Sequence, residues 1–339
     1  MKKLRILALV HDHLVPPEDT TGIDVLEAEW KMEYDVIETL RERGHEVRVL
    51  GVHDDLAGIR PTAGFFEPHI VFNLMEAFAG VTTFDQNVVS YLELLRLRYT
   101  GCNPRGLILA RDKALSKKLL AYHRIPVPDF TVVRYGRKPA LQKKMHFPLI
   151  VKSLFFEASA GISQASVVEN AEQLAKRVQF IHDSLGTGAI VEQFIDGREM
   201  YVGVLGNERL DVLPVWEMSF AGMADNRWRI ATERVKWSTQ YQKRNGIMTN
   251  AARLAAANAE HIQRIAKRAY RALDLNGYAR IDLRVDEEGR PYVLEANPNP
   301  NLAYGEDFAE SAETAGVSYE QLLERIATLG MRWEPARTG

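Results

Sequence analysis

Two runs of strand-forming residues near the C-terminus constrain the fold of this chain more than any other feature. They are YARIDLRV, at residues 278–285, and YVLEAN, at residues 292–297. The segment EEGR between them, at residues 287–290, is typical of a tight turn, because glycine readily adopts the positive φ that such turns require. The pattern predicts an antiparallel hairpin.

The register of this hairpin brings polar side chains together. A two-residue loop centred on residues 288–289 sets Asp282 opposite Glu295 and Arg280 opposite Asn297. Because side chains alternate across a strand, these four residues then share one face. The other face is expected to carry the apolar side chains of Ile281, Leu283, Leu294 and Ala296.

A sheet face with two carboxylates, an amide and a guanidinium is costly unless something binds there. Oxygen ligands of this kind suit Mg²⁺, which usually binds through one or two carboxylates and substrate phosphates. The hairpin therefore predicts a Mg²⁺ site. The alternative is a solvated outer face with two cross-strand ion pairs.

The bulk composition is that of an ordinary globular protein. A length of 339 residues suggests two or three domains. A net charge of −2 gives no electrostatic case for nucleic acid or anionic membranes, and no apolar stretch is long enough to span a bilayer. The N-terminus lacks a small-residue cleavage site and is better explained as a buried strand than as a signal peptide. The single cysteine, Cys102, excludes an internal disulfide, favours a reducing cytoplasm and is expected to pack in the core.

The first hundred residues alternate between strand-like and helix-like segments, which favours an α/β domain. Strands are predicted over residues 4–10, 46–50 and 69–73. A helix between the first two strands is predicted from apolar residues at helical spacing, namely Leu26, Trp30, Ile37 and Leu40. Gly44 is placed to end that helix.

The residues after the first strand disfavour a nicotinamide-binding site. A nicotinamide-binding Rossmann domain needs a glycine-rich turn there, and His11-Asp12-His13 stands in its place. Two nearby histidines also suggest a metal site. In a continuing strand they would point to opposite faces, so the metal interpretation is disfavoured.

Loop-like residues from about 100 onward separate this domain from the rest. Asp112 is expected to cap a helix whose apolar side chains are Leu115, Leu119 and Tyr122. A second unit is predicted with a strand at 146–153, a Gly/Ser/Ala-rich loop at 157–163, a helix from Asn170 and a strand at 189–195. The predicted domains are residues 1–110, 111–195 and 196–332.

Charged residues in the second and third units occur in an order that suits a nucleotide. Lys113 lies in the first turn of its helix. Lys152 ends an apolar strand just before the small-residue loop, whose backbone N–H groups can fold over phosphates. Glu192 precedes the apolar pair Phe194-Ile195, which offers a surface for a planar base to pack against. Glu199 follows shortly after. Each of these residues alone is weak evidence for a nucleotide site. Their order along the chain, ahead of the predicted Mg²⁺ hairpin, is what suggests one.

This arrangement resembles the ATP-grasp superfamily and, within it, the D-alanine–D-alanine ligase-like branch. The segments FPLIVK (147–152), IVEQFI (190–195), RID (280–282) and LEANP (294–298) are close to the family's patterns, and VFNL (71–74) and YTG (99–101) look like that branch. The resemblance implies a three-domain architecture of α/β and α+β class. An N-terminal Rossmann-like domain would precede two α+β subdomains that enclose the nucleotide.

The resemblance also implies a role for each matching residue. Lys113 and Lys152 would hold ATP phosphates, Glu192 would accept the adenine amino group, and Glu199 would bind the ribose hydroxyls. The base would also contact Phe194 and Ile195, and Ser159 would belong to the same ATP site. The ligands of two Mg²⁺ ions, with Mn²⁺ as an alternative, would be Asp282, Glu295 and Asn297. Arg280 would stabilise an oxyanion, and Lys236 would reach the γ-phosphate.

The activity implied is the joining of a carboxylate to an amine through an acyl phosphate, with release of ADP and phosphate. Both substrate subsites depart from the family. Residues 11–18 replace a Gly-Gly-x-Ser-x-Glu-like segment, and residues 298–303 replace a Gly-Met-Thr segment with a later serine. Ala158 and Trp237 stand where the family has a serine and a tyrosine that link the closing loops. These departures favour an amino acid or peptide acceptor other than D-alanine.

Three alternatives stay open. The protein could be a genuine D-alanine–D-alanine ligase, or a nucleotide-binding member without turnover. It could also ligate a peptide or protein terminus, helped by the basic residues Arg227, Arg229, Arg234, Lys236, Lys243 and Arg244, which are otherwise a solvated loop. The expected partners are small molecules, with no nucleic acid or membrane, and a homodimer is one option.

Overall fold

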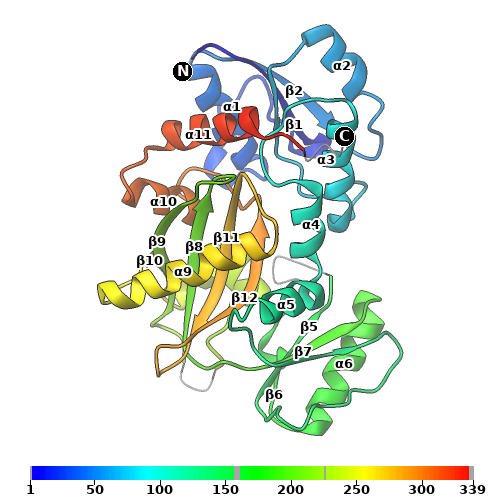
Figure 1. Cartoon of the computed structure of the whole chain (residues 1–339), viewed down its shortest axis with the longest axis vertical. Coiled ribbons are helices and arrows are strands. Elements are labelled where there is room, and N and C mark those ends of the chain that lie inside the picture. The colour runs from blue at the N-terminus through cyan, green and yellow to red at the C-terminus, as the bar shows by residue number, and fades with distance from the viewer. Residues whose placement is uncertain (1, 156–160, 225–226, 336–339) are drawn as a thin grey trace.

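The computed structural model describes residues 2–155, 161–224 and 227–335, and Figure 1 shows their arrangement. The elements form three separate sheets with helices packed against them. Each of the three predicted domain ranges contains one sheet. Among the described residues, no helix is both long and apolar enough to cross a membrane.

The N-terminal sheet is parallel, in the order β2-β1-β3, with β1 at Arg5–His11, β2 at Glu46–Val52 and β3 at Ile70–Asn73. The five central side chains of β1 are fully buried, as a strand covered on both faces requires. The helices that follow in this part are α1 (Lys31–Glu42), α2 (Ile59–Phe66) and α3 (Asp85–Leu94). The C-terminal helix α11, Tyr319–Arg332, returns to pack beside α1 (Figure 1).

Two sequence expectations for this region need correction. The predicted first helix begins only at Lys31, and Leu26 lies in a short 3-10 turn, Val25–Glu27, where it is 76% exposed. The strand also does not continue through the histidines. It ends at His11, and a 3-10 turn, Asp12–Leu14, brings His13 back to within 2.7 Å of His11, measured between their Nδ1 atoms.

The central sheet has the order β4-β7-β5-β6 and is antiparallel, with strands Phe130–Val133, Ala189–Gln193, Leu149–Ser153 and Val167–Val168. Helix α6, Ala171–Leu185, begins after its predicted cap, because the side chain of Asn170 accepts a hydrogen bond from the amide of Gln173. The short 3-10 helix Gln164–Ser166 precedes β6.

Helices α4 (Pro104–Arg111) and α5 (Lys113–Tyr122) connect the N-terminal and central sheets. Asp112 caps α5 as expected, since its carboxylate accepts from the amides of Ala114 and Leu115. The buried face of α5 was predicted wrongly. Tyr122 is 82% exposed, whereas Lys117 is fully buried.

The C-terminal sheet has five antiparallel strands in the order β10-β9-β8-β11-β12. In that order they span Ile247–Ala251, Asp211–Phe220, Arg198–Leu205, Tyr278–Val285 and Pro291–Pro298. The long helix α9, Ala256–Ala272, covers one face, and α10, Asp307–Thr314, packs against the other (Figure 1). The basic stretch contains two short helices, α7 (Glu233–Trp237) and α8 (Thr239–Arg244).

The hairpin has the predicted residue pairs, but its turn and its strand geometry differ from the prediction. Asp282 lies opposite Glu295, and Arg280 lies opposite Asn297. The turn, however, is not a two-residue loop, because Val285 pairs with Pro291 and a bulge follows between Asp282 and Leu283. The bulge turns Leu294 toward the cleft and puts Val293 in the core, which corrects the predicted apolar face.

Candidate active site

A cleft lies between strands β5 and β7 of the central sheet and strands β11 and β12 of the C-terminal sheet. Nine of the twelve predicted site residues line it, namely Lys113, Lys152, Glu192, Phe194, Ile195, Glu199, Lys236, Asp282 and Glu295. Arg280 and Asn297 form the adjacent cross-strand pair of the hairpin. Ser159 lies outside the described residues.

One wall of the cleft carries a buried cluster of two lysines and one glutamate. Glu192, on β7, is 1% exposed, and its carboxylate lies 3.0 Å from the Nζ of Lys152 and 3.3 Å from that of Lys117. Burial alone would raise the pKa of Glu192, but the two lysines outweigh burial and lower it, so the carboxylate stays ionised. The Oε1 atom of Glu192 makes the 3.3 Å ion pair with Lys117 but has no well-aligned hydrogen bond among the described residues.

Lys117 was not singled out from the sequence. Its Nζ donates to the carbonyl of Leu294 at 2.8 Å, so this side chain ties α5 to β12 as well as to Glu192 on β7. The available signal was its spacing, because Lys117 follows Lys113 by four residues and shares its helix face. Because the buried face of α5 was predicted from its apolar residues alone, Lys117 was not considered.

The wall next to this cluster is apolar. Phe194 packs with Ile150, Val167 and Ile230, and its ring centroid lies 5.1 Å from that of Trp228. The cleft is also lined there by Ile162, Ile195 and Leu294. A flat aromatic group could lie in this slot beside the unsatisfied Oε1 of Glu192, because aromatic rings favour apolar walls with one polar edge contact.

Glu199 lies at the same end of the cleft and is paired with a residue that the sequence reasoning missed. Its carboxylate lies 3.2 Å from Arg284 and accepts from the hydroxyl of Tyr201. Arg284 also donates to the carbonyl of Ile195 at 2.8 Å and stacks over Phe194. Arg284 thus holds the segment that carries the predicted base contacts.

The opposite end of the cleft is strongly charged. Burial raises the pKa of Glu295, but Lys113, Lys236, Lys152 and Arg280 outweigh it and lower this pKa to about 2. The Nζ atom of Lys113 lies 3.9 Å from Glu295 Oε2. Glu295 is therefore an ionised carboxylate that faces cations.

Asp282 and Arg280 form a bidentate pair, with distances of 2.8 and 3.0 Å. Burial raises the pKa of Asp282 even though Arg280 opposes the change. Asn297, across from Arg280, has a buried Nδ2 atom without a hydrogen-bond partner among the described residues. Two carboxylates and an amide oxygen on neighbouring strands fit the ligand set of Mg²⁺, and the unpaired amide leaves a donor for an anionic group.

Two loops meet over the cleft. The side chain of Gln164 forms two hydrogen bonds with the backbone of Trp228, at 2.8 and 2.9 Å. The carboxylate of Glu233 accepts from the amide of Gly161. These contacts join the two loops. Ala158 lies outside the described residues, and Trp237 ends the short helix α7.

The segment after β12 is fastened to the N-terminal part of the chain. Asn299 adopts a positive φ of 53°, and its side-chain oxygen accepts from the amide of Cys102 at 2.8 Å. Lys31, at the start of α1, donates to the carbonyl of Tyr304 at 2.7 Å. The region that departs from the family is thus an ordered loop.

Cys102 itself is fully buried, as expected, and burial raises its pKa to about 12.

Comparisons with known proteins identify the family of this chain. A family model described as the D-ala D-ala ligase C-terminus matches residues 119–328. A D-alanine–D-alanine ligase of Desulforudis audaxviator (strain MP104C) is 31% identical over 297 residues, which cover 87% of this chain and 90% of that protein. An uncharacterized protein, y4sG, of Sinorhizobium fredii (strain NBRC 101917 / NGR234) is 32% identical over 304 residues, covering 88% of this chain and 86% of that protein.

Solved structures show the same fold. The D-alanine–D-alanine ligase of Bacillus anthracis, complexed with ATP, superposes with a TM-score of 0.73 at 21% identity and covers 97% of this chain and 98% of that chain. The VanG D-Ala:D-Ser ligase of Enterococcus faecalis gives a TM-score of 0.69 at 17% identity, covering 97% and 100%. The predicted three-domain architecture of α/β and α+β class is confirmed. The chain belongs to the D-alanine–D-alanine ligase-like branch of the ATP-grasp superfamily, whose members are ATP-dependent ligases that form carbon–nitrogen bonds.

Proposed function

We propose that this protein is an ATP-dependent carboxylate–amine ligase whose acceptor is an amino acid or peptide other than D-alanine. The observation that carries the proposal is the composition of the cleft. Three lysines, Lys113, Lys152 and Lys236, face two hairpin carboxylates, Asp282 and Glu295, with an apolar slot alongside. This arrangement suits a polyphosphate joined to a flat base.

The nucleotide would lie with its base against Phe194 and Ile195. Its amino group would donate to Glu192 Oε1, a buried acceptor that is ion-paired with Lys117 but has no well-aligned hydrogen bond in the described part of the chain. Glu199 would take the ribose hydroxyls while Arg284 holds the carboxylate in place. Lys113 and Lys152 would neutralise the phosphates, and Ser159 would approach them from its loop.

Asp282, Glu295 and Asn297 would hold two Mg²⁺ ions, or Mn²⁺ in their place. When bound, these ions neutralise charge on the phosphoryl group during transfer. Lys236 would steady the γ-phosphate from the loop that closes the cleft. Arg280, fixed by Asp282 and stacked 4.6 Å above the ring of Tyr201, would stabilise the oxyanion formed when an amine attacks the activated carboxyl group.

The chemistry requires that water be kept out. A carboxylate does not react with an amine at neutral pH, because an oxide ion is a poor leaving group. Transfer of the γ-phosphoryl group from ATP converts the carboxylate to an acyl phosphate and releases ADP. The amine then attacks the acyl carbon, loses a proton and displaces phosphate to form the amide. The loop contacts between Gln164 and Trp228 would exclude water that would otherwise hydrolyse the acyl phosphate.

The case for an altered acceptor comes from the two substrate regions. Residues 11–18 lack the glycines and the serine of the family's first segment, and residues 298–303 lack its Gly-Met-Thr and later serine. A screen tests this proposal. Purified protein is incubated with ATP, Mg²⁺ and a library of amino acids and dipeptides, and released phosphate and product mass are measured. We expect turnover with a pair other than two D-alanines.

A genuine D-alanine–D-alanine ligase is the second candidate, because several relatives at about 30% identity carry that name. Turnover with D-alanine alone, at a rate no other pair exceeds, would favour it. ATP consumption with no acid–amine pair would favour a nucleotide-binding protein. A product only with peptide acceptors would favour ligation to a peptide or protein terminus.

A further inference from the structure

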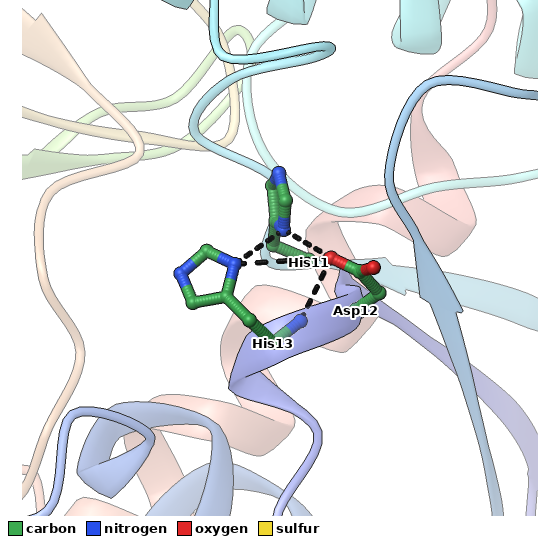
Figure 2. A group of neighbouring side chains, drawn as sticks. All are labelled: His11, Asp12 and His13. Carbon is green, nitrogen blue, oxygen red and sulfur yellow. Dashed lines mark hydrogen bonds and ion pairs between the residues drawn. The ribbon is translucent and has the colours of Figure 1, made fainter.

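Three histidines and one aspartate gather at the C-terminal edge of the N-terminal sheet, at the end of β1 opposite its N-terminus. Figure 2 shows His11, Asp12 and His13, whose donor atoms point toward one another. The Nδ1 atom of His11 lies 2.7 Å from that of His13 and 2.8 Å from Asp12 Oδ1. His53, immediately after β2, places its Nδ1 atom 3.3 Å from the same oxygen.

The backbone is shaped to bring these residues together. Strand β1 ends at His11, and the 3-10 turn Asp12–Leu14 folds His13 back over it. The turn packs against β2 at Gly51, where a Cβ atom would come within 3.0 Å of Asp12 Cα and 2.8 Å of a methyl group of Val15. Glycine at this position therefore permits the close approach that sets Asp12 beside His53.

The donor atoms of His11, Asp12 and His13 all lie within 4.8 Å of one another, which suits a single small cation, and His53 lies beside Asp12. In a tetrahedral zinc site with bonds of about 2.0–2.1 Å, neighbouring ligand atoms are about 3.3 Å apart. Asp12 Oδ1 lies 2.8, 3.8 and 3.3 Å from the Nδ1 atoms of His11, His13 and His53. Small side-chain rotations would equalise these distances, since Asp12, His13 and His53 are 50–60% exposed.

We propose that His11, Asp12, His13 and His53 bind one divalent transition-metal ion, of which Zn²⁺ is the best match. Imidazole nitrogen suits zinc, whereas Mg²⁺ prefers the oxygen ligands of the hairpin. Its ligands are distinct from the residues proposed to hold ATP and Mg²⁺, and its turn lies in the first of the two substrate regions. Its ligands come from β1, the turn after it and the end of β2, so a bound ion would pin the turn that forms one edge of the N-terminal sheet.

Zinc binding to the full-length protein is the direct test. Protein stripped with EDTA and exchanged into excess Mg²⁺ is titrated with Zn²⁺ by calorimetry, and with Co²⁺ by visible absorption. We expect one equivalent of Zn²⁺ and the intense visible bands of four-coordinate Co²⁺. His13→Ala and His53→Ala should each weaken Zn²⁺ binding by about tenfold or more, because even indirect support of a metal ligand is worth that much.

His261→Ala is the matched control, because His261 is an exposed histidine on helix α9 far along the chain. It should bind Zn²⁺ like the wild type. Circular dichroism confirms that each variant folds, and Asp12→Asn repeats the test with an isosteric change. The proposal is overturned if the wild type takes up no zinc in excess Mg²⁺. It is equally overturned if zinc binding persists in both histidine variants or is lost only in Glu295→Gln.

Discussion

Replacing Lys117 with methionine tests whether the buried charge cluster orders the nucleotide cleft. Lys117 and Glu192 are each 1% exposed and lie 3.3 Å apart, and Lys117 also donates to Leu294. Removing one partner of a buried ion pair costs about 3–5 kcal/mol. Two effects reduce this cost: Glu192 is still paired with Lys152, 3.0 Å away, and the variant no longer buries the charge of Lys117. We therefore expect the free energy of unfolding to fall by about 2–3 kcal/mol.

The same change should weaken ATP binding. Glu192 loses one of the two cations that orient it, and β12 loses its link to α5. If the poorer alignment of Glu192 weakens the binding free energy of ATP by about 1.4 kcal/mol, KM for ATP rises about tenfold. Unfolding midpoints in urea, followed by tryptophan fluorescence, and initial rates against ATP concentration measure the two effects. Lys118→Met is the control, because Lys118 is the exposed neighbour on the same helix.

A double-mutant cycle sharpens the comparison. If Lys117 acts through Glu192, then Lys117→Met in a Glu192→Gln background should cost much less than in the wild type. Fully additive losses in the cycle would refute the reasoning. So would a Lys117→Met protein with the midpoint and KM of Lys118→Met.

Three further predictions concern the hairpin and the N-terminal domain. Glu295→Gln should abolish ADP formation and leave the circular dichroism spectrum unchanged; near-normal turnover would remove the metal assignment. Arg280→Ala should lower kcat by at least about a hundredfold with a smaller effect on KM for ATP, because it acts on the transition state; equal effects on both would make it a binding residue. Burial, with a smaller effect from Glu76, raises the pKa of Glu33 from 4.5 to about 7, so the folded state holds this proton more tightly. Stability should therefore fall as the pH rises from about 4.5 to about 7, and Glu33→Gln should stabilise the protein at pH 8 by up to about 3 kcal/mol. Melting temperatures across this range check the slope, and an unchanged slope in Glu33→Gln would contradict the assignment.

The hairpin illustrates how far sequence reasoning reached. The predicted pairing of Asp282 with Glu295 and of Arg280 with Asn297 was correct, because the bulge after Asp282 offsets the longer turn. The bulge beside Leu283 could not be predicted, since it compensates for a longer turn and leaves no mark in the residue pattern. The predicted register was correct even though the predicted turn was wrong.

Buried charges were the main omission. Lys117 and Arg284 are both almost completely buried, and a lysine or arginine without a partner is normally expected at the surface. Their partners, Glu192 and Glu199, come from strands distant in sequence, so only the tertiary fold reveals the pairs. The two histidines were considered as a metal site and disfavoured, because a continuing strand was assumed where a 3-10 turn changes the direction of His13.

The most direct test of the central claim follows the oxygen atoms of the acid substrate. The cleft is proposed to activate a carboxylate by phosphorylation before an amine attacks it. With the acid–amine pair found by screening, the carboxylate is labelled with ¹⁸O and the released phosphate is analysed by mass spectrometry. The account predicts that each phosphate carries one ¹⁸O atom from the acid and that ADP and amide form in equal amounts. Unlabelled phosphate accompanying amide formation would contradict it.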